Sequence, residues 1–173
     1  MYKLYSATLE LTRQCNARCK HCIIDAHSKK ENELSTDRII ELIEELHDEG
    51  CKDIVFTGGE ALLRKEWPLF MQKAHSMDMR CVLMTNGLLL NDDVIKILRL
   101  FDVSVGLSLD GATAQTHDGL RGIPGLFDHI VETIRRSSLN CYAIEFPRTR
   151  CTKRLINFIR RKCLAITSCK AKL

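Results

Sequence analysis

The stretch Arg13-Gln-Cys-Asn-Ala-Arg-Cys-Lys-His-Cys22 places Cys15, Cys19 and Cys22 at a C-x3-C-x2-C spacing. Three thiols within eight residues suit a site that gathers thiolates around one metal centre. An iron–sulfur cubane held by three cysteines keeps one iron open for another ligand. A structural zinc site needs a fourth ligand to close its tetrahedron, so zinc bound with His21 or a more distant residue is the alternative.

The composition is that of a globular protein with one domain. The chain has 173 residues, 45% of them hydrophobic and 28% charged, which is enough for a substantial core. It contains no apolar run of about 18 residues, as a membrane span needs, and its start lacks the apolar run of a secretion signal. We therefore expect a cytoplasmic protein that does not enter a membrane. Its nine cysteines are expected to be thiols or metal ligands rather than disulfides.

The charge changes sign near the C-terminus. Residues 148–173 carry nine Lys and Arg and no Asp or Glu, whereas the other 147 residues carry 17 basic and 22 acidic side chains, a net charge of −5. We predict a core over residues 1–140. We predict a basic tail over residues 141–173, which is either a fifth strand–helix unit or an aberrant, truncated or frame-shifted end. A tail that binds nucleic acid is the competing interpretation, but interleaved aromatic residues are missing, so we expect no nucleic-acid partner.

Hydrophobic periodicity predicts strands that alternate with helices along the chain. Alternation at this spacing is typical of βαβ units, which form a parallel sheet with right-handed crossovers. A polar loop that contains His117 and Arg121 is expected before the last of the clear helices. If the tail is aberrant, the sheet is left with an unprotected edge and an incomplete mouth. The expected strands cover residues 2–11, 53–57, 80–85, 103–110 and 141–146, and the expected helices cover 35–49, 65–77, 91–101, a stretch through 127–134 and one lined by Leu155, Phe158 and Ile159.

Polar motifs follow each of the first four predicted strands. The cysteines follow the first, Gly58-Gly59-Glu60 the second and Asn86-Gly87 the third, and Ser108 and Asp110 end the fourth. Ligands bind at the carboxyl ends of strands in parallel α/β sheets and barrels. We therefore expect these four motifs to converge on one site.

Taken together, these motifs resemble those of the radical S-adenosylmethionine (radical SAM) enzymes over about residues 2–140. The motifs Ser108-Leu-Asp-Gly111 and His117-Asp-x-x-Arg-Gly122 are most similar to those of the SPASM-type branch. Enzymes of this branch modify peptides or mature cofactors, and they usually have further iron–sulfur clusters in a C-terminal extension. The stretch Cys19-Lys-His-Cys-Ile-Ile-Asp-Ala26 is also similar to relatives in haem-type tetrapyrrole synthesis. The motifs are the cysteine triplet, Thr57-Gly-Gly-Glu60, Thr85-Asn-Gly87, Ser108-Leu-Asp-Gly111 and His117-Asp-x-x-Arg-Gly122.

The resemblance implies a fold and an activity. The fold is a partial parallel (β/α) barrel that stops after four to five of the family's six units. The three cysteines hold a [4Fe–4S] cluster whose open iron binds S-adenosylmethionine. Reductive cleavage of the nucleotide gives a 5′-deoxyadenosyl radical, which takes hydrogen from a peptide or cofactor precursor. The electron comes from a low-potential donor of the flavodoxin or ferredoxin type.

The resemblance also implies roles for the residues around the nucleotide. Gly58 and Gly59 let the backbone approach its methionine moiety, and Glu60 accepts a hydrogen bond from the ammonium group. Arg121 pairs with the carboxylate of the nucleotide. The family has proline where this chain has Ala61, which loosens the loop but removes no ligand. The remaining expected nucleotide contacts are His21 beside the adenine, Asn86, Ser108 and Asp110.

Simpler interpretations of the same residues remain open. Gly58-Gly59 is also typical of a turn, Ser108 and Asp110 of a polar strand end, and Arg121 of a surface loop. The whole chain is alternatively a non-catalytic remnant that binds a cluster, or a zinc-binding interaction domain. Cys51, Cys81 and Cys141 are expected in the core, and His117 has no assigned ligand role.

Overall fold

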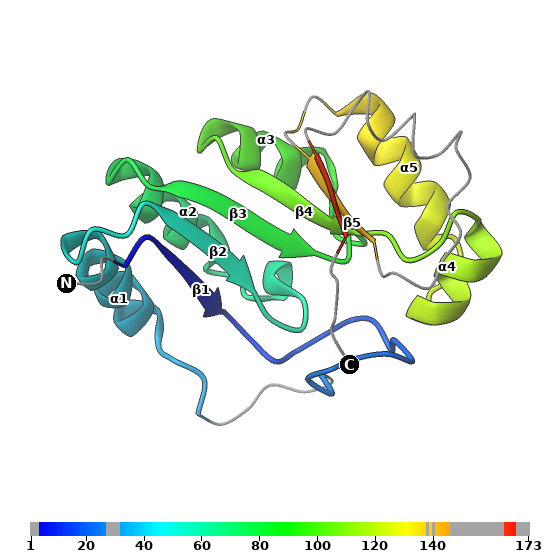
Figure 1. Cartoon of the computed structure of the whole chain (residues 1–173), viewed down its shortest axis with the longest axis horizontal. Helices are drawn as coiled ribbons and strands as arrows, with labels where there is room; N and C mark the ends of the chain where they lie inside the picture. Colours follow the sequence, from blue (N-terminus) through cyan, green and yellow to red (C-terminus); the bar gives the residue numbers. More distant parts are fainter. Residues whose placement is uncertain (1–3, 27–31, 138, 140, 146–164, 169–173) are drawn as a thin grey trace.

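The computed structural model describes residues 4–26, 32–137, 139, 141–145 and 165–168. Within them, six parallel strands form one sheet in chain order, from β1 at one end to β6 at the other. Figure 1 shows the strands from β1 to β4 side by side in this order. The predicted parallel α/β sheet is therefore confirmed. The strands are β1 (Ser6–Glu10), β2 (Asp53–Thr57), β3 (Arg80–Thr85), β4 (Ser104–Ser108), β5 (Cys141–Glu145) and β6 (Ala165–Ser168).

Helices connect the first five strands and share one apolar core with the sheet. Fully buried side chains such as Phe56 of β2, Phe70 of α2 and Leu83 of β3 belong to this core. Parallel neighbours in chain order with helical crossovers make the sheet an open part of a (β/α) barrel. The helices are α1 (Thr36–Asp48), η1 (Ala61–Leu63), α2 (Trp67–Ser76), α3 (Asp92–Leu100), α4 (Ala114–Arg121) and α5 (Leu126–Arg136).

Local signals explain why the predicted helices begin and end where they do. The Ser35 side chain accepts a hydrogen bond from the Arg38 N–H at the start of α1, and Asn91 accepts from the Val94 N–H at the start of α3. These caps satisfy amide groups that each helix leaves without partners. Gly50 follows α1 with a φ of 89°, as expected of a glycine that ends a helix.

The segment predicted as a loop around His117 and Arg121 is the helix α4, so that prediction was wrong. Thr113 caps the helix by accepting from the Thr116 N–H, and Gly122 ends it in the left-handed conformation. The helix is mostly polar and contains Gly119, so it lacks an apolar stripe. It buries His117 and Arg121 instead, so its stability depends on tertiary packing of these two side chains.

Two strands described within residues 141–173, β5 and β6, extend the same sheet. β5 pairs with β4 as expected of the fifth strand, and β6 pairs with β5 in the register Tyr142↔Ala165 to Glu145↔Ser168. β6 therefore covers the edge of β5. The predicted helix of Leu155, Phe158 and Ile159 lies outside the described residues. No helix in the described part of the chain has the length and hydropathy that would let it cross a membrane.

Candidate active site

The three cysteines line a cavity at the carboxyl ends of the strands. They lie in residues 11–26, which follow β1 and which we call the cysteine loop; Figure 1 shows this loop running past the strand ends toward α4. The cavity has a volume of about 320 Å³ and also contains residues from the ends of β2, β3 and β4. Of the predicted nucleotide contacts, the cavity-lining ones are His21, Gly58, Gly59, Asn86, Ser108 and Arg121. The predicted convergence of the four motifs is thus present.

Each of the three cysteine sulfurs accepts one N–H hydrogen bond. The Ala17 N–H donates to Cys15 Sγ at 3.4 Å, and the Ala26 N–H donates to Cys22 Sγ at 3.4 Å. Cys19 Sγ accepts from Nη1 of Arg121 at 3.6 Å. Donors aimed at sulfur are typical of thiolates that hold a metal, since they offset the negative charge on the ligand.

Burial raises the pKa of the Cys15 thiol, with the Ala17 N–H opposing this effect and the charge of Glu60 adding to it. A coordinated metal would oppose this effect and favour the thiolate. Among the described residues, no group of three or more His, Cys, Asp or Glu side chains is arranged around a single metal ion. A cubane binds each cysteine to a different iron, so three cysteines with separate donors fit that cluster.

Gly58 and Gly59 lie against the backbone of the cysteine loop. The Gly59 N–H donates to the Thr12 carbonyl and the Glu60 N–H to the Gln14 carbonyl, both at 2.8 Å. A Cβ on Gly58 would lie 2.3 Å from the Thr12 oxygen, and one on Gly59 would lie 2.3 Å from the Gln14 oxygen. The chain's own cysteine loop therefore requires glycine at both positions. The resemblance had implied a different reason, the approach of the methionine moiety of the nucleotide.

The Glu60 carboxylate is bound by the chain's own donors and does not line the cavity. Its Oε1 accepts from Thr85 Oγ1 at 2.8 Å and from the Leu62 N–H at 3.2 Å, and its Oε2 accepts from the Asn86 N–H at 2.8 Å. The side chain is 1% exposed, and burial raises its pKa while these three donors oppose the shift. The structure thus places Glu60 under the cavity, where it joins the end of β2 to the end of β3.

Asp110 and Arg121 form a buried ion pair beside the cavity. Asp110 is 0% exposed and Arg121 is 8% exposed, and Nε of Arg121 donates to Oδ2 of Asp110. Burial works against the charged guanidinium, but Asp110 and Cys19 hold the pKa of Arg121 above its ordinary value. His21 Nε2 lies 3.6 Å from the same carboxylate oxygen, and burial lowers the pKa of His21. The surface-loop interpretation of Arg121 is therefore excluded.

Sequence reasoning missed several residues that hold the site. His117 is fully buried, and its Nδ1 accepts from the Asp110 N–H at 3.1 Å. Asn16 Oδ1 accepts from the Asn86 side chain at 2.8 Å. Both lie inside motifs that the sequence showed. The partner of His117 is only seven residues away, in the preceding motif, whereas Asn16 and Asn86 are 70 residues apart. Cys51 and Cys81 are buried as predicted, whereas the side chain of Cys141 lies outside the described part.

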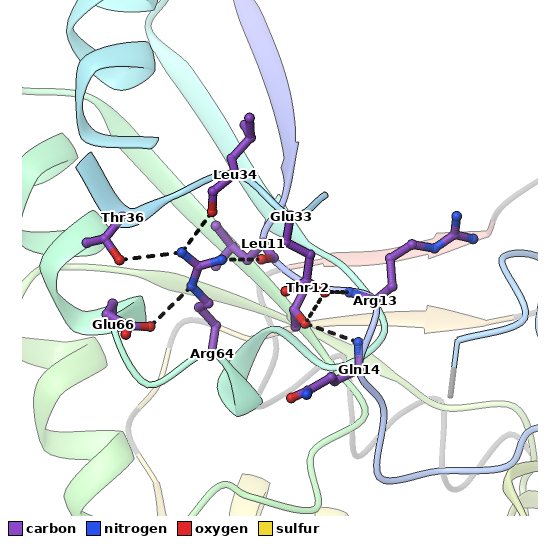
Figure 2. A network of polar contacts seen from close by, with 9 residues as sticks. All are labelled: Leu11, Thr12, Arg13, Gln14, Glu33, Leu34, Thr36, Arg64 and Glu66. Carbon is purple, nitrogen blue, oxygen red and sulfur yellow. Dashed lines mark hydrogen bonds and ion pairs between the residues drawn. The ribbon is translucent and has the colours of Figure 1, made fainter. Parts of the chain in front are cut away.

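A further network fixes the start of the cysteine loop (Figure 2). Arg64 donates to the Leu11 carbonyl at 3.2 Å and to the Leu34 carbonyl at 3.0 Å, and it pairs with Glu66 at 3.1 Å. Its guanidinium thus connects three segments: the residue after β1, the segment before α1 and the segment before α2. No local pattern in the sequence marks Arg64, because its partners come from three separate segments.

Glu33 completes this network on the other side of the loop. Its Oε1 accepts from Thr12 Oγ1 and from the Arg13 N–H, both at 2.8 Å, as Figure 2 shows. Thr12 Oγ1 in turn accepts from the Gln14 N–H at 3.1 Å. The backbone just before Cys15 is therefore held in one conformation by side chains outside the cysteine motif.

Comparison with known proteins identifies relatives of this chain. The chain is 42% identical over 120 residues to the Fe-coproporphyrin III synthase of Methanosarcina barkeri, covering 68% of this chain and 30% of that protein. It is 36% identical over 138 residues to the sporulation killing factor maturation protein SkfB of Bacillus subtilis, covering 79% of this chain and 33% of that protein. The chain thus spans about a third of the length of these curated relatives.

The fold and the family are also shown independently. The structure of Streptococcus suis SuiB bound to S-adenosylmethionine superposes with a TM-score of 0.79 at 14% identity, over 92% of this chain and 39% of that chain, which shows a shared fold. The model of the radical SAM superfamily matches residues 9–139. The chain therefore belongs to the radical SAM superfamily.

Proposed function

We propose that Cys15, Cys19 and Cys22 hold a [4Fe–4S] cluster and that S-adenosylmethionine binds in the adjoining cavity. The observation that carries this proposal is that all three sulfurs accept N–H donors while they line one cavity at the strand ends. When bound, the cluster and the nucleotide supply a 5′-deoxyadenosyl radical that takes a hydrogen atom from substrate.

The residues of the chain divide into two groups around this cavity. His21, Asn86, Ser108 and Arg121 line it with polar groups and are proposed to contact the nucleotide, and the backbone of Gly58 and Gly59 forms the wall between them. Glu60 and Asp110 lie behind this surface and are proposed to orient Asn86 and Arg121. Positioning by buried carboxylates keeps these groups in place before the nucleotide arrives.

The substrate is proposed to be a peptide or a cofactor precursor. SkfB is named as a maturation protein for a killing factor, and the Methanosarcina relative is named for an iron porphyrin, so the relatives include both classes. The proposed reaction requires one electron at low potential, and we propose a flavodoxin or ferredoxin as its donor.

The test is anaerobic reconstitution with iron and sulfide, followed by electron paramagnetic resonance of the reduced protein with and without S-adenosylmethionine. We expect a [4Fe–4S] signal that shifts when the nucleotide is added. A cluster whose signal does not shift would support a remnant that only binds iron and sulfide, and zinc without sulfide would support the interaction domain.

A matched pair of variants tests the ligand assignment. Cys19→Ala should lose the brown colour and the iron. Cys81→Ala should keep both, because Cys81 is buried in the core and burial raises the pKa of its thiol to about 12, which keeps it protonated. Retention of a full cluster in Cys19→Ala would refute the assignment.

A further inference from the structure

We propose that Arg121, held by Asp110, positions the Cys19 thiolate and raises the reduction potential of the cluster. This inference rests on the proposed function, because it requires a cluster on Cys15, Cys19 and Cys22. It assigns Arg121 a role that is separate from pairing with the carboxylate of the nucleotide. Of the sulfur donors in the described residues, Arg121 is the one that carries a charge and comes from outside the cysteine loop.

The guanidinium of Arg121 uses two edges at once. Its Nε donates to Asp110 Oδ2, and its Nη1 donates to Cys19 Sγ at 3.6 Å. The guanidinium is planar and its N–H directions are fixed, so the bond to Asp110 also determines where Nη1 points. Asp110 is fixed in turn by complete burial and by the bond from its backbone N–H to Nδ1 of His117.

The end of α4 lies directly on the cysteine loop around Cys19. The Lys20 N–H donates to the Leu120 carbonyl at 2.9 Å, on the residue just before Arg121. On the other side of Arg121, a Cβ added to Gly122 would lie 2.9 Å from the Arg18 carbonyl oxygen. Arg121 is therefore carried by backbone that packs against both neighbours of Cys19, which limits how far the guanidinium can move from the sulfur.

The charge and the hydrogen bond act on the cluster in the same direction. Reduction adds one negative charge to a cluster, and hydrogen bonds to its sulfurs are among the factors that set its potential. A guanidinium in a buried site stabilises the added charge more than it would in water. Loss of Arg121 should therefore make the cluster harder to reduce.

The experiment is a redox titration of the reconstituted chain, followed by electron paramagnetic resonance and carried out without S-adenosylmethionine. For Arg121→Gln we expect a tenfold shift of the one-electron reduction equilibrium toward the oxidised cluster, which is about 59 mV. A residue that only binds the carboxylate of the nucleotide would leave this nucleotide-free potential unchanged. The inference is overturned if the equilibrium constant for one-electron reduction changes by less than threefold, or if the potential becomes less negative than that of the wild type.

A second variant and a charge control keep the test decisive. If Arg121→Gln does not fold, Arg121→Lys keeps the charge but replaces the fork with one ammonium group, so we expect a smaller shift in the same direction, and an unchanged potential overturns the inference. Arg136→Gln removes an equal charge from the surface of α5, where Arg136 pairs with Asp92, and should leave the potential unchanged. An equal shift in Arg136→Gln would assign the effect to net charge and overturn the inference.

The result also separates this inference from the proposed function. If the wild-type chain assembles no cluster, the proposed function itself is wrong. If the wild-type chain has a normal cluster, and the Arg121→Gln variant has the same iron content and the same reduction potential, only the role of Arg121 is wrong.

Discussion

The side-chain amide of Asn86 donates to Oδ1 of Asn16 at 2.8 Å, across 70 residues of sequence. Asn86 follows β3, and Asn16 lies between Cys15 and Cys19 in the cysteine loop. The backbone N–H of Asn86 is bound to Glu60, and its Oδ1 accepts from the Leu88 N–H, so the residue is fixed on both sides. The loop between two proposed cluster ligands is therefore anchored to the sheet.

Loss of this anchor should loosen the cluster. In a double-mutant cycle of Asn16→Ala and Asn86→Ala, we expect a coupling free energy of about 1 kcal/mol, as for other hydrogen bonds that are shielded from water. Both single variants should release iron to a ferrous chelator faster than the wild type does. Strictly additive effects on unfolding in urea would show that the bond contributes nothing.

Gly59→Ala should destabilise the protein by about 1–3 kcal/mol, because the new Cβ would meet the Gln14 carbonyl and force the loop away from β2. Gly119→Ala is the matched control, since Gly119 lies within α4 and a Cβ there meets nothing within 4 Å. The control should gain about 0.5–1 kcal/mol from helix propensity. Thermal unfolding of the two variants measures both effects, and equal stabilities would contradict the close approach.

Arg64→Met should cost about 2 kcal/mol, because the carbonyl of the buried residue Leu11 loses a charged donor, whereas the bond to the exposed residue Leu34 contributes little. Arg38→Met removes an exposed arginine from α1 that pairs with glutamates on its own helix, and it should change stability little. Urea denaturation compares the two variants. Because Arg64 holds the start of the cysteine loop, Arg64→Met should also reduce the iron bound per chain, and an undiminished iron content would limit its role to stability.

The burial of His117 leads us to expect that the protein loses stability in acid. Burial lowers its pKa below the ordinary value of 6.5, so the unfolded chain binds the extra proton first. The free energy of unfolding should therefore fall as the pH drops below about 6.5, and a proton on Nδ1 would remove the acceptor for the Asp110 N–H. Urea denaturation between pH 7.5 and 5.5 should show a shallower decline for His117→Gln than for the wild type. Parallel declines would remove His117 as the cause.

The parts of the fold that depend on neighbouring residues were predictable from sequence. The bounds of β2 and β3 were predicted because short apolar strands end in glycine or asparagine signals. The helix predicted over 35–49 is α1, which differs from that range by one residue at each end. α4 was missed because it has no apolar stripe and instead buries two polar side chains, His117 and Arg121, the latter against the cysteine loop. Periodicity cannot show such contacts.

The site divides in the same way. The cavity-lining positions, such as Ser108 and Asn86, followed from the rule that ligands bind at strand ends. The position of Glu60 behind the cavity did not follow, because its three donors come from η1 and from the end of β3. A carboxylate in a motif looks the same in sequence whether it faces a ligand or the backbone.

The bond between Arg121 and Cys19 spans 102 residues, which has a consequence for the order of events during synthesis. When the ribosome has completed the three cysteines, the donors to Cys15 and Cys22 are already within or next to the motif. The donor to Cys19 follows after roughly 5–20 s at ordinary elongation rates. A cluster inserted into the nascent chain before α4 emerges would therefore form while Cys19 still lacks the Arg121 donor.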